Sequence, residues 1–186
     1  MNEWINKIEV ATREVRTSVR FIFEETDPII VHSIISAAHQ ILSDLSRQHQ
    51  RARSMVKPPG CNRKLLNNAA NFFKHADRDP SERINIEPLP EMNSMLLVDA
   101  IVMLQTISGS LPMEAKIFWA WYMVNREEDF AGAGQVIDLI ITENKHMRGM
   151  SLRKMRQLLQ FQQVLNAEEP LPAWVELHYQ RRENLE

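Results

Sequence analysis

Apolar residues that recur every third or fourth position are the feature of this 186-residue sequence that most constrains its fold. This spacing places apolar side chains on one face of a helix. No run alternates apolar and polar residues with a period of two between turn residues, so strands are not predicted. The clearest helical run follows Asp27-Pro28 and contains Val31, Ile34, Ile35, Ala38, Ile41, Leu42 and Leu45.

Start and stop signals divide the chain into an all-α, single-domain bundle of six or seven helices. Asp27 and Pro28 are suited to an N-cap and a first helical position, Gly109 to a C-terminal cap and Ser151 to another N-cap. Asp99 is the one charge in a run that is apolar nearly all round, which predicts a buried central helix. The predicted helices cover residues 4–23, 28–52, 62–76, 92–107, 112–125, 136–141 and 152–165.

The composition fits one globular domain. A content of 44% hydrophobic and 25% charged residues excludes wholesale disorder, and a length below about 200 residues favours a single core. We assign residues 1–167 to the bundle and residues 168–186 to a C-terminal tail or short helix.

The location predicted from the sequence is the cytoplasm of a prokaryotic type of cell. A single cysteine, Cys61, cannot form an internal disulfide, which favours a reducing compartment. The first ten residues lack the basic and apolar regions of a secretory signal. The uncharged stretch 28–43 is too short and too polar to cross a membrane, so we expect no membrane association.

A net charge of −2 conceals two acid-free segments. We call residues 47–75 the first basic segment and residues 144–167 the second. Such segments can hold the phosphates of RNA or a nucleotide, pair with an acidic protein, or simply form solvated helix ends and loops. The second segment carries Lys145, Arg148, Arg153, Lys154 and Arg156, and the first carries Arg47, Arg51, Arg53, Lys57, Arg63, Lys64 and Lys74. In the first segment, the cations other than Lys74 are predicted to bind the polyanion or partner, and the cations of the second segment are not assigned this role.

Asn68, Asn71 and His75 are three and four residues apart, so in a helix they share one face, with Lys74 beside them. A histidine among amides and a cation can act as general acid or base on a phosphodiester, while Asn68, Asn71 and Lys74 orient or neutralise the phosphate. The alternative is structural, because a histidine near the C-terminus of a helix also stabilises that end.

Asn68 is followed by six residues and then His75, on a helix that comes after a long helix. This pattern resembles the HEPN superfamily of all-helical proteins. Active members of that superfamily have an arginine where Asn68 stands. The resemblance covers roughly residues 28–108. It implies a metal-independent ribonuclease or a toxin or defence component, and a dimer that brings two copies of His75 into a basic cleft.

Metal and cofactor chemistry has little support in the sequence. Glu143 and His146 form a single Glu-x-x-His, whereas di-iron bundles use two. His32 and His39 are seven residues apart and are predicted to form hydrogen bonds at the edge of the core or at a dimer seam. Neither a P-loop nor a dinucleotide-binding glycine motif occurs. We therefore predict no metal and no cofactor.

The fifth predicted helix is the candidate interface, because it carries Trp119, Trp121 and Tyr122. Two residues apart on a helix point about 200° apart, so Trp119 and Trp121 are predicted not to enter the same core together. One of them would then be exposed or buried in a contact with another subunit. This predicts a homodimer or a subunit of a complex, and it keeps a non-enzymatic helical adaptor open as the alternative to RNA or nucleotide binding.

Overall fold

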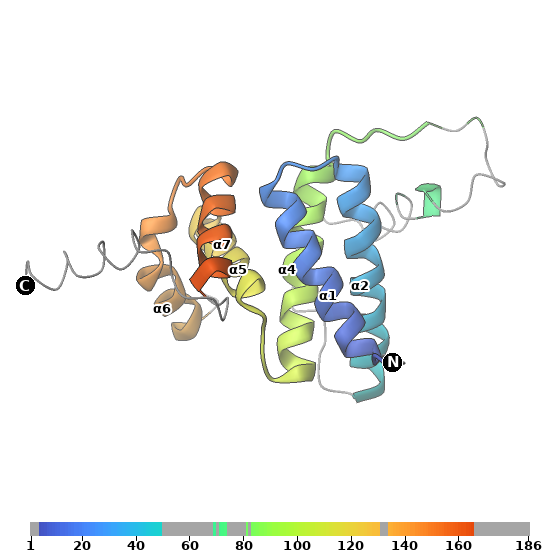
Figure 1. Ribbon diagram of the computed structural model, residues 1–186, viewed down its shortest axis with the longest axis horizontal. Coiled ribbons are helices and arrows are strands. Elements are labelled where there is room, and N and C mark those ends of the chain that lie inside the picture. The colour runs from blue at the N-terminus through green and yellow to red at the C-terminus, as the bar shows by residue number, and fades with distance from the viewer. Residues whose placement is uncertain are drawn as a thin grey trace, which may run out of the picture.

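The computed structural model describes residues 4–49, 69, 71–73, 81, 83–130 and 134–165. Within these ranges every regular element is helical and no strand occurs, which confirms the all-α prediction (Figure 1). The elements are α1 (Lys7–Phe23), α2 (Pro28–His49), α4 (Leu89–Ser108), α5 (Met113–Asn125), the 3-10 turn η1 (Glu127–Phe130), α6 (Gln135–Glu143), the 3-10 turn η2 (Lys145–Met147) and α7 (Leu152–Leu165).

Local capping determines where these helices begin and end. Asn6 and Glu9 form a reciprocal capping box, which starts α1 three residues after the predicted position. The Asp27 side chain accepts a hydrogen bond from the Ile29 backbone N–H at 2.8 Å, immediately before α2. Gly109 ends α4 with a φ of 73°, a left-handed conformation that glycine adopts without strain.

The later boundaries differ in detail from the sequence-based expectation. α4 begins at Leu89 rather than at residue 92, with a proline in its first turn. The predicted loop after residue 125 contains η1, and α6 extends to both sides of the predicted 136–141. Ser151 accepts a hydrogen bond from the Lys154 N–H at 3.4 Å at the start of α7, as predicted. Of the predicted third helix, only Ala69 and residues 71–73 are described, and they are helical.

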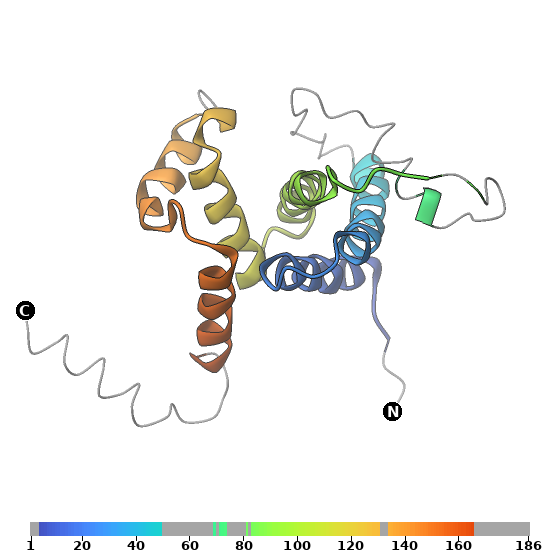
Figure 2. The same ribbon diagram turned by 90° about the horizontal axis from the view of Figure 1, so that it is seen from above.

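α1 and α2 form an antiparallel hairpin, and α4 lies against both (Figures 1 and 2). Residue numbers increase in the same direction along α2 and α4, because His32 contacts Asn93 and His39 contacts Asp99. The two helices are therefore parallel. A parallel pair requires the chain that joins His49 to Leu89 to return over the length of α2, which is about 33 Å for 22 residues.

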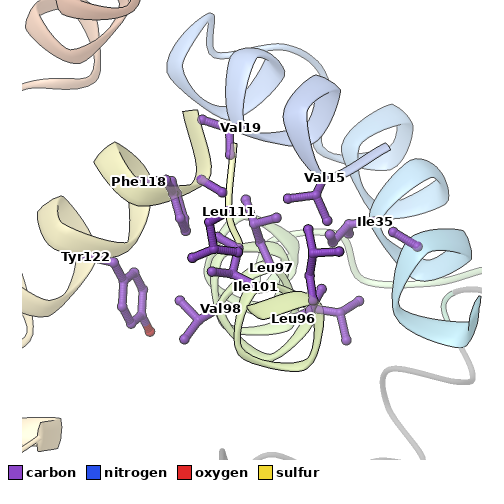
Figure 3. Close-up of a cluster of buried hydrophobic side chains, with 14 of the residues drawn as sticks. Val15, Val19, Ile35, Leu96, Leu97, Val98, Ile101, Leu111, Phe118 and Tyr122 are labelled. Atoms are coloured by element: carbon purple, nitrogen blue, oxygen red, sulfur yellow. The ribbon is translucent and has the colours of Figure 1, made fainter. Parts of the chain in front are cut away.

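α4 occupies the centre of the core (Figure 3). Its apolar residues point in several directions, and those from Leu96 to Leu104 are nearly all buried. Val15 and Val19 of α1 and Ile35 of α2 cover it on one side, while Phe118 of α5 packs at the other end of the cluster. This arrangement confirms that the run around Asp99 is the central helix.

α5, α6 and α7 form the second half of the molecule, and one continuous core joins them to the first half. Phe23 at the end of α1 contacts both Phe118 and Trp121 of α5, with ring centroids 5.8 and 5.6 Å apart. Met155 of α7 is also buried in this shared cluster. A second, smaller cluster around Ile141 holds α6 against α5.

A group of three charged residues links α1 to the start of α5. Arg16 and Arg20 both donate to Oε1 of Glu114, at 3.0 and 2.8 Å, and the Glu114 side chain is only 8% exposed. Burial raises the pKa of this carboxyl, but hydrogen bonds from Arg20, from its own backbone and from Arg16 outweigh burial, so the pKa of Glu114 is lowered overall. Glu114 therefore favours folding in its ionised form.

We expect Glu114→Gln to remove a pH-dependent part of the folding stability. The folded-state pKa lies below the ordinary value of 4.5, so the stabilisation is complete above about pH 4.5 and disappears as the pH falls through the folded-state pKa. The variant should lose about 1–3 kcal/mol at pH 7 and have a flatter stability profile in acid. Urea unfolding from pH 3 to pH 7 measures this, and parallel profiles for the two proteins would contradict it.

Candidate functional site

Two histidines of α2 meet two polar residues of α4 along the contact between these helices. We call His32, His39, Asn93 and Asp99 the polar seam. His32 is fully buried, Asn93 is 1% exposed and Asp99 is 7% exposed. Buried polar groups need hydrogen-bond partners, and the two helices supply them to each other. This outcome agrees with the expectation that both histidines form hydrogen bonds at the edge of the core.

The pair nearer the N-terminal ends of α2 and α4 is His32 and Asn93. Asn93 donates from Nδ2 to the Pro28 carbonyl oxygen at 2.9 Å, so its Oδ1 is left to face His32 Nδ1 at 2.8 Å. An amide oxygen only accepts, so Nδ1 of His32 carries the hydrogen. The other ring nitrogen, Nε2, is buried without a hydrogen-bond partner, and the ring lies edge-on to Phe73 at a centroid distance of 5.8 Å.

The pair near the middle of α2 and α4 is His39 and Asp99. Nε2 of His39 lies 2.7 Å from Oδ2 of Asp99, and the His39 side chain is 21% exposed. A carboxylate accepts but does not donate, so this contact places the hydrogen on Nε2. In the neutral ring Nδ1 then has the lone pair. The two histidines of the seam are thus held in opposite tautomers.

The His39–Asp99 pair has the arrangement required of an oriented general base. The carboxylate holds the ring in place and keeps a proton on one nitrogen, which leaves the other nitrogen to accept a proton from a bound hydroxyl. His32 lacks this possibility because it is fully buried. The sequence around His39 does not indicate such a role, because its partner Asp99 lies 60 residues away in the chain.

The predicted catalytic group falls largely outside the described residues. Asn71 is described and lies exposed on a short helical turn. Asn68, Lys74 and His75 lie outside the described part of the chain, so their roles remain predictions. Phe73, which was not selected, is the described residue of this stretch that touches the polar seam.

Among the predicted binding residues, Arg47 is the one that the structure describes. It lies near the end of α2 with its side chain 72% exposed, and it pairs with Asp44 one turn earlier. Hydrogen bonding from Gln40 is the main cause that holds the pKa of Asp44 below its ordinary value. Arg51, Arg53, Lys57, Arg63 and Lys64 lie outside the described residues.

The two described ends of the first basic segment lie far apart on α2. Arg47 is near the C-terminus of this helix, and Phe73 contacts His32 near its N-terminus. Fifteen helical residues separate positions 32 and 47, which corresponds to about 22 Å. His39, the more exposed histidine of the polar seam, lies between these two positions on the same helix.

The second basic segment begins on η2 and continues into α7. Lys145, Arg148, Arg153 and Lys154 are all exposed there. Arg148 forms an ion pair with Glu127 of η1. This surface is therefore cationic but partly neutralised by its neighbour.

The three aromatic residues predicted to form an interface lie within the chain's own packing. Tyr122 is 7% exposed, and burial raises its pKa to about 12. Trp121 donates from Nε1 to the Met150 carbonyl oxygen at 3.0 Å. Trp119 and Trp121 both pack in part against the main core, contrary to the expectation from their 200° separation, because α5 has neighbours on two sides. Their role in an interface between subunits stays a prediction.

Metal-binding geometry is not found in the described part of the chain, where no group of three His, Cys, Asp or Glu side chains converges. Glu143 and His146 are both exposed at the end of α6 and in η2. None of the described helices is both long enough and apolar enough to cross a membrane. Comparisons with protein-family models, curated proteins and solved structures found no match to this chain.

We expect the two histidines of the polar seam to show opposite tautomers in solution. Long-range ¹H–¹⁵N correlation spectra at pH 8 should show the proton of His32 on Nδ1 and that of His39 on Nε2, because Asn93 and Asp99 accept at those atoms. His32→Gln and His39→Gln assign the signals. Finding the same tautomer in both rings would contradict the geometry of the seam.

Proposed function

We propose that this protein binds single-stranded RNA through the first basic segment, residues 47–75. The observation that supports the proposal is the parallel pairing of α2 and α4. Arg47 lies near the C-terminal end of α2, and Phe73 contacts His32 near its N-terminal end, so the two described ends of this acid-free segment lie beside opposite ends of one helix. Seven cations and no acid occur in the sequence between Arg47 and His75.

RNA is the ligand that this charge pattern favours. A flexible polyanion gains affinity from each phosphate that a lysine or arginine neutralises, because counterions are released. Phe72 and Phe73 stand within the same segment, and aromatic rings provide stacking surfaces for unpaired bases. Both rings are half-buried: Phe73 lies edge-on to His32, and Phe72 lies edge-on to Phe73.

Binding should depend on salt and on the first basic segment. With four phosphate contacts, an increase from 50 to 200 mM salt should weaken binding of a labelled 20-nucleotide RNA about 50-fold. Replacing Arg51, Arg53, Arg63 and Lys64 by Gln should weaken binding at least ten-fold and reduce this salt dependence. Fluorescence anisotropy on the full chain measures both effects.

The matched control changes the same number of cations in the second basic segment, Lys145, Arg148, Arg153 and Lys154, each to Gln. We expect this variant to bind within about three-fold of the original protein, because its cations lie on η2 and α7. No binding at 50 mM salt would overturn the proposal. An equal loss in both variants would show general attraction to charge rather than a binding segment.

The His39–Asp99 pair favours a second candidate function, metal-independent cleavage of the bound RNA. In this reaction Nδ1 of His39 takes the proton of a ribose 2′-hydroxyl, the 2′-oxygen forms a bond to the adjacent phosphorus, and the bond from phosphorus to the 5′-oxygen breaks. The proton then passes to the 5′-oxygen, leaving a 2′,3′-cyclic phosphate. His75 is the alternative acid–base residue predicted from the sequence.

Cleavage should persist in EDTA and give cyclic phosphate ends. His39→Gln should reduce the rate by at least about 100-fold if His39 is the base, and His75→Ala should do so if His75 is. His32→Gln is the control, since a fully buried ring cannot reach the substrate. Gel analysis of labelled RNA, with RNA affinity measured in parallel, separates chemistry from binding. Intact RNA after prolonged incubation would exclude this second function while leaving the binding proposal to its own test.

A further inference from the structure

α6 exposes a small apolar face at the opposite end of the molecule from α2 (Figures 1 and 2). Val136 is 71% exposed and Leu139 is 59% exposed, although both are large apolar side chains. They lie three residues apart and are therefore neighbours on the helix surface. Glu143, seven residues after Val136, lies on the same side two turns further along.

The packing of α6 determines that this face points outward. Ile137 and Ile140 are half-buried and Ile141 is buried, and all three belong to the small cluster with Met123 and Val124 of α5. Since these isoleucines occupy the inner side of the nine-residue helix, Val136 and Leu139 are left on the outer side. Packing of the inner side of α6 against α5 therefore fixes the orientation of the exposed face.

Exposed acids outnumber exposed cations on α6 and on the two 3-10 turns, η1 and η2, that flank it in the chain. Glu128 and Asp129 belong to η1, which precedes α6, and Asp138 and Glu143 lie on α6 itself. All four are exposed, and none of them forms an ion pair with another described residue. Lys145 of η2 is also exposed, and Arg148 pairs with Glu127, so α6 and its flanking turns combine an exposed apolar face with a net negative charge.

We propose that this face of α6 binds a cationic amphipathic helix of a partner protein. An amphipathic helix recognises such a surface with apolar residues spaced three and four apart, and lysines or arginines beside them meet the carboxylates of α6 and η1. This interaction is separate from RNA binding and does not depend on it. It uses residues that the first basic segment does not contain.

The charge of the surface argues against the other occupants. Two copies of α6 facing each other would bring Asp138 and Glu143 of both copies along one contact, where like charges repel. Phosphates of RNA and anionic lipid headgroups would meet the same four carboxylates. A cationic partner is the occupant for which both the apolar face and the net negative charge are favourable.

The test uses the full chain and a labelled 18-residue peptide of Leu and Lys, with Leu at helical spacing. Fluorescence anisotropy should show binding of this peptide and at least ten-fold weaker binding of a scrambled peptide with the same composition. The double variant Val136→Asn/Leu139→Asn should weaken binding at least ten-fold. Asp138→Asn/Glu143→Gln should weaken it several-fold and remove most of its dependence on salt.

Ile30→Asn is the matched control, because Ile30 is 50% exposed on α2, far from α6. It should leave peptide affinity unchanged, and circular dichroism should show the same helix content in every variant. Equal binding of the patterned and scrambled peptides, or unchanged binding by the Val136/Leu139 variant, would overturn the proposal. So would self-association in light scattering that the Val136/Leu139 variant abolishes, because a second copy would then be the occupant.

Discussion

The structure depends on the burial of two polar side chains in its central helix. α4 is apolar nearly all round, yet it carries Asn93 and Asp99 into the core, where an unpaired amide or carboxylate would be destabilising. His32 and His39 of α2 supply the partners. Apolar packing alone tolerates several relative positions of two helices, whereas these two hydrogen-bonded pairs are satisfied in one direction and one register. The pairing therefore specifies how α2 and α4 lie together.

The direction of that pairing has a consequence for the surface. Consecutive antiparallel helices need only a short turn, such as residues 24–27 between α1 and α2. The parallel pair α2 and α4 needs a long return connection, and most of the positive charge of the chain's first half is placed in it. The direction of the α2–α4 pair thus determines that residues 50–88 join opposite ends of two parallel helices.

Much of the helical framework could be predicted from the sequence, because its signals are local. The Asp27-Pro28 start, the Gly109 end and the Ser151 cap each depend on residues within one turn of the chain. The pairs of the polar seam could not be predicted, because nothing near His39 indicates that Asp99, 60 residues later, will face it. Trp119 and Trp121 show the same limit: helix geometry predicts that they point in different directions, but it does not predict that α1 and α4, which precede α5, and α6, which follows it, all pack against this helix. His75 and Asn68 lie outside the described residues, so for them the sequence remains the evidence.

The two binding surfaces proposed above have opposite charges, and α5 lies between α6 and the helices α1, α2 and α4. It packs against α1 on one side and contacts α6 on the other, so it separates α2, which carries the exposed Arg47, from the acids of α6. Attraction between exposed charges is largely screened beyond about 8 Å at physiological salt, so surfaces at opposite ends of the molecule do not neutralise each other. The net charge of −2 for the whole chain therefore does not indicate the local charge of either surface. An anionic ligand and a cationic helix could be held at the same time, and α5 with Glu114 bound to Arg16 and Arg20 would be the rigid connection between them.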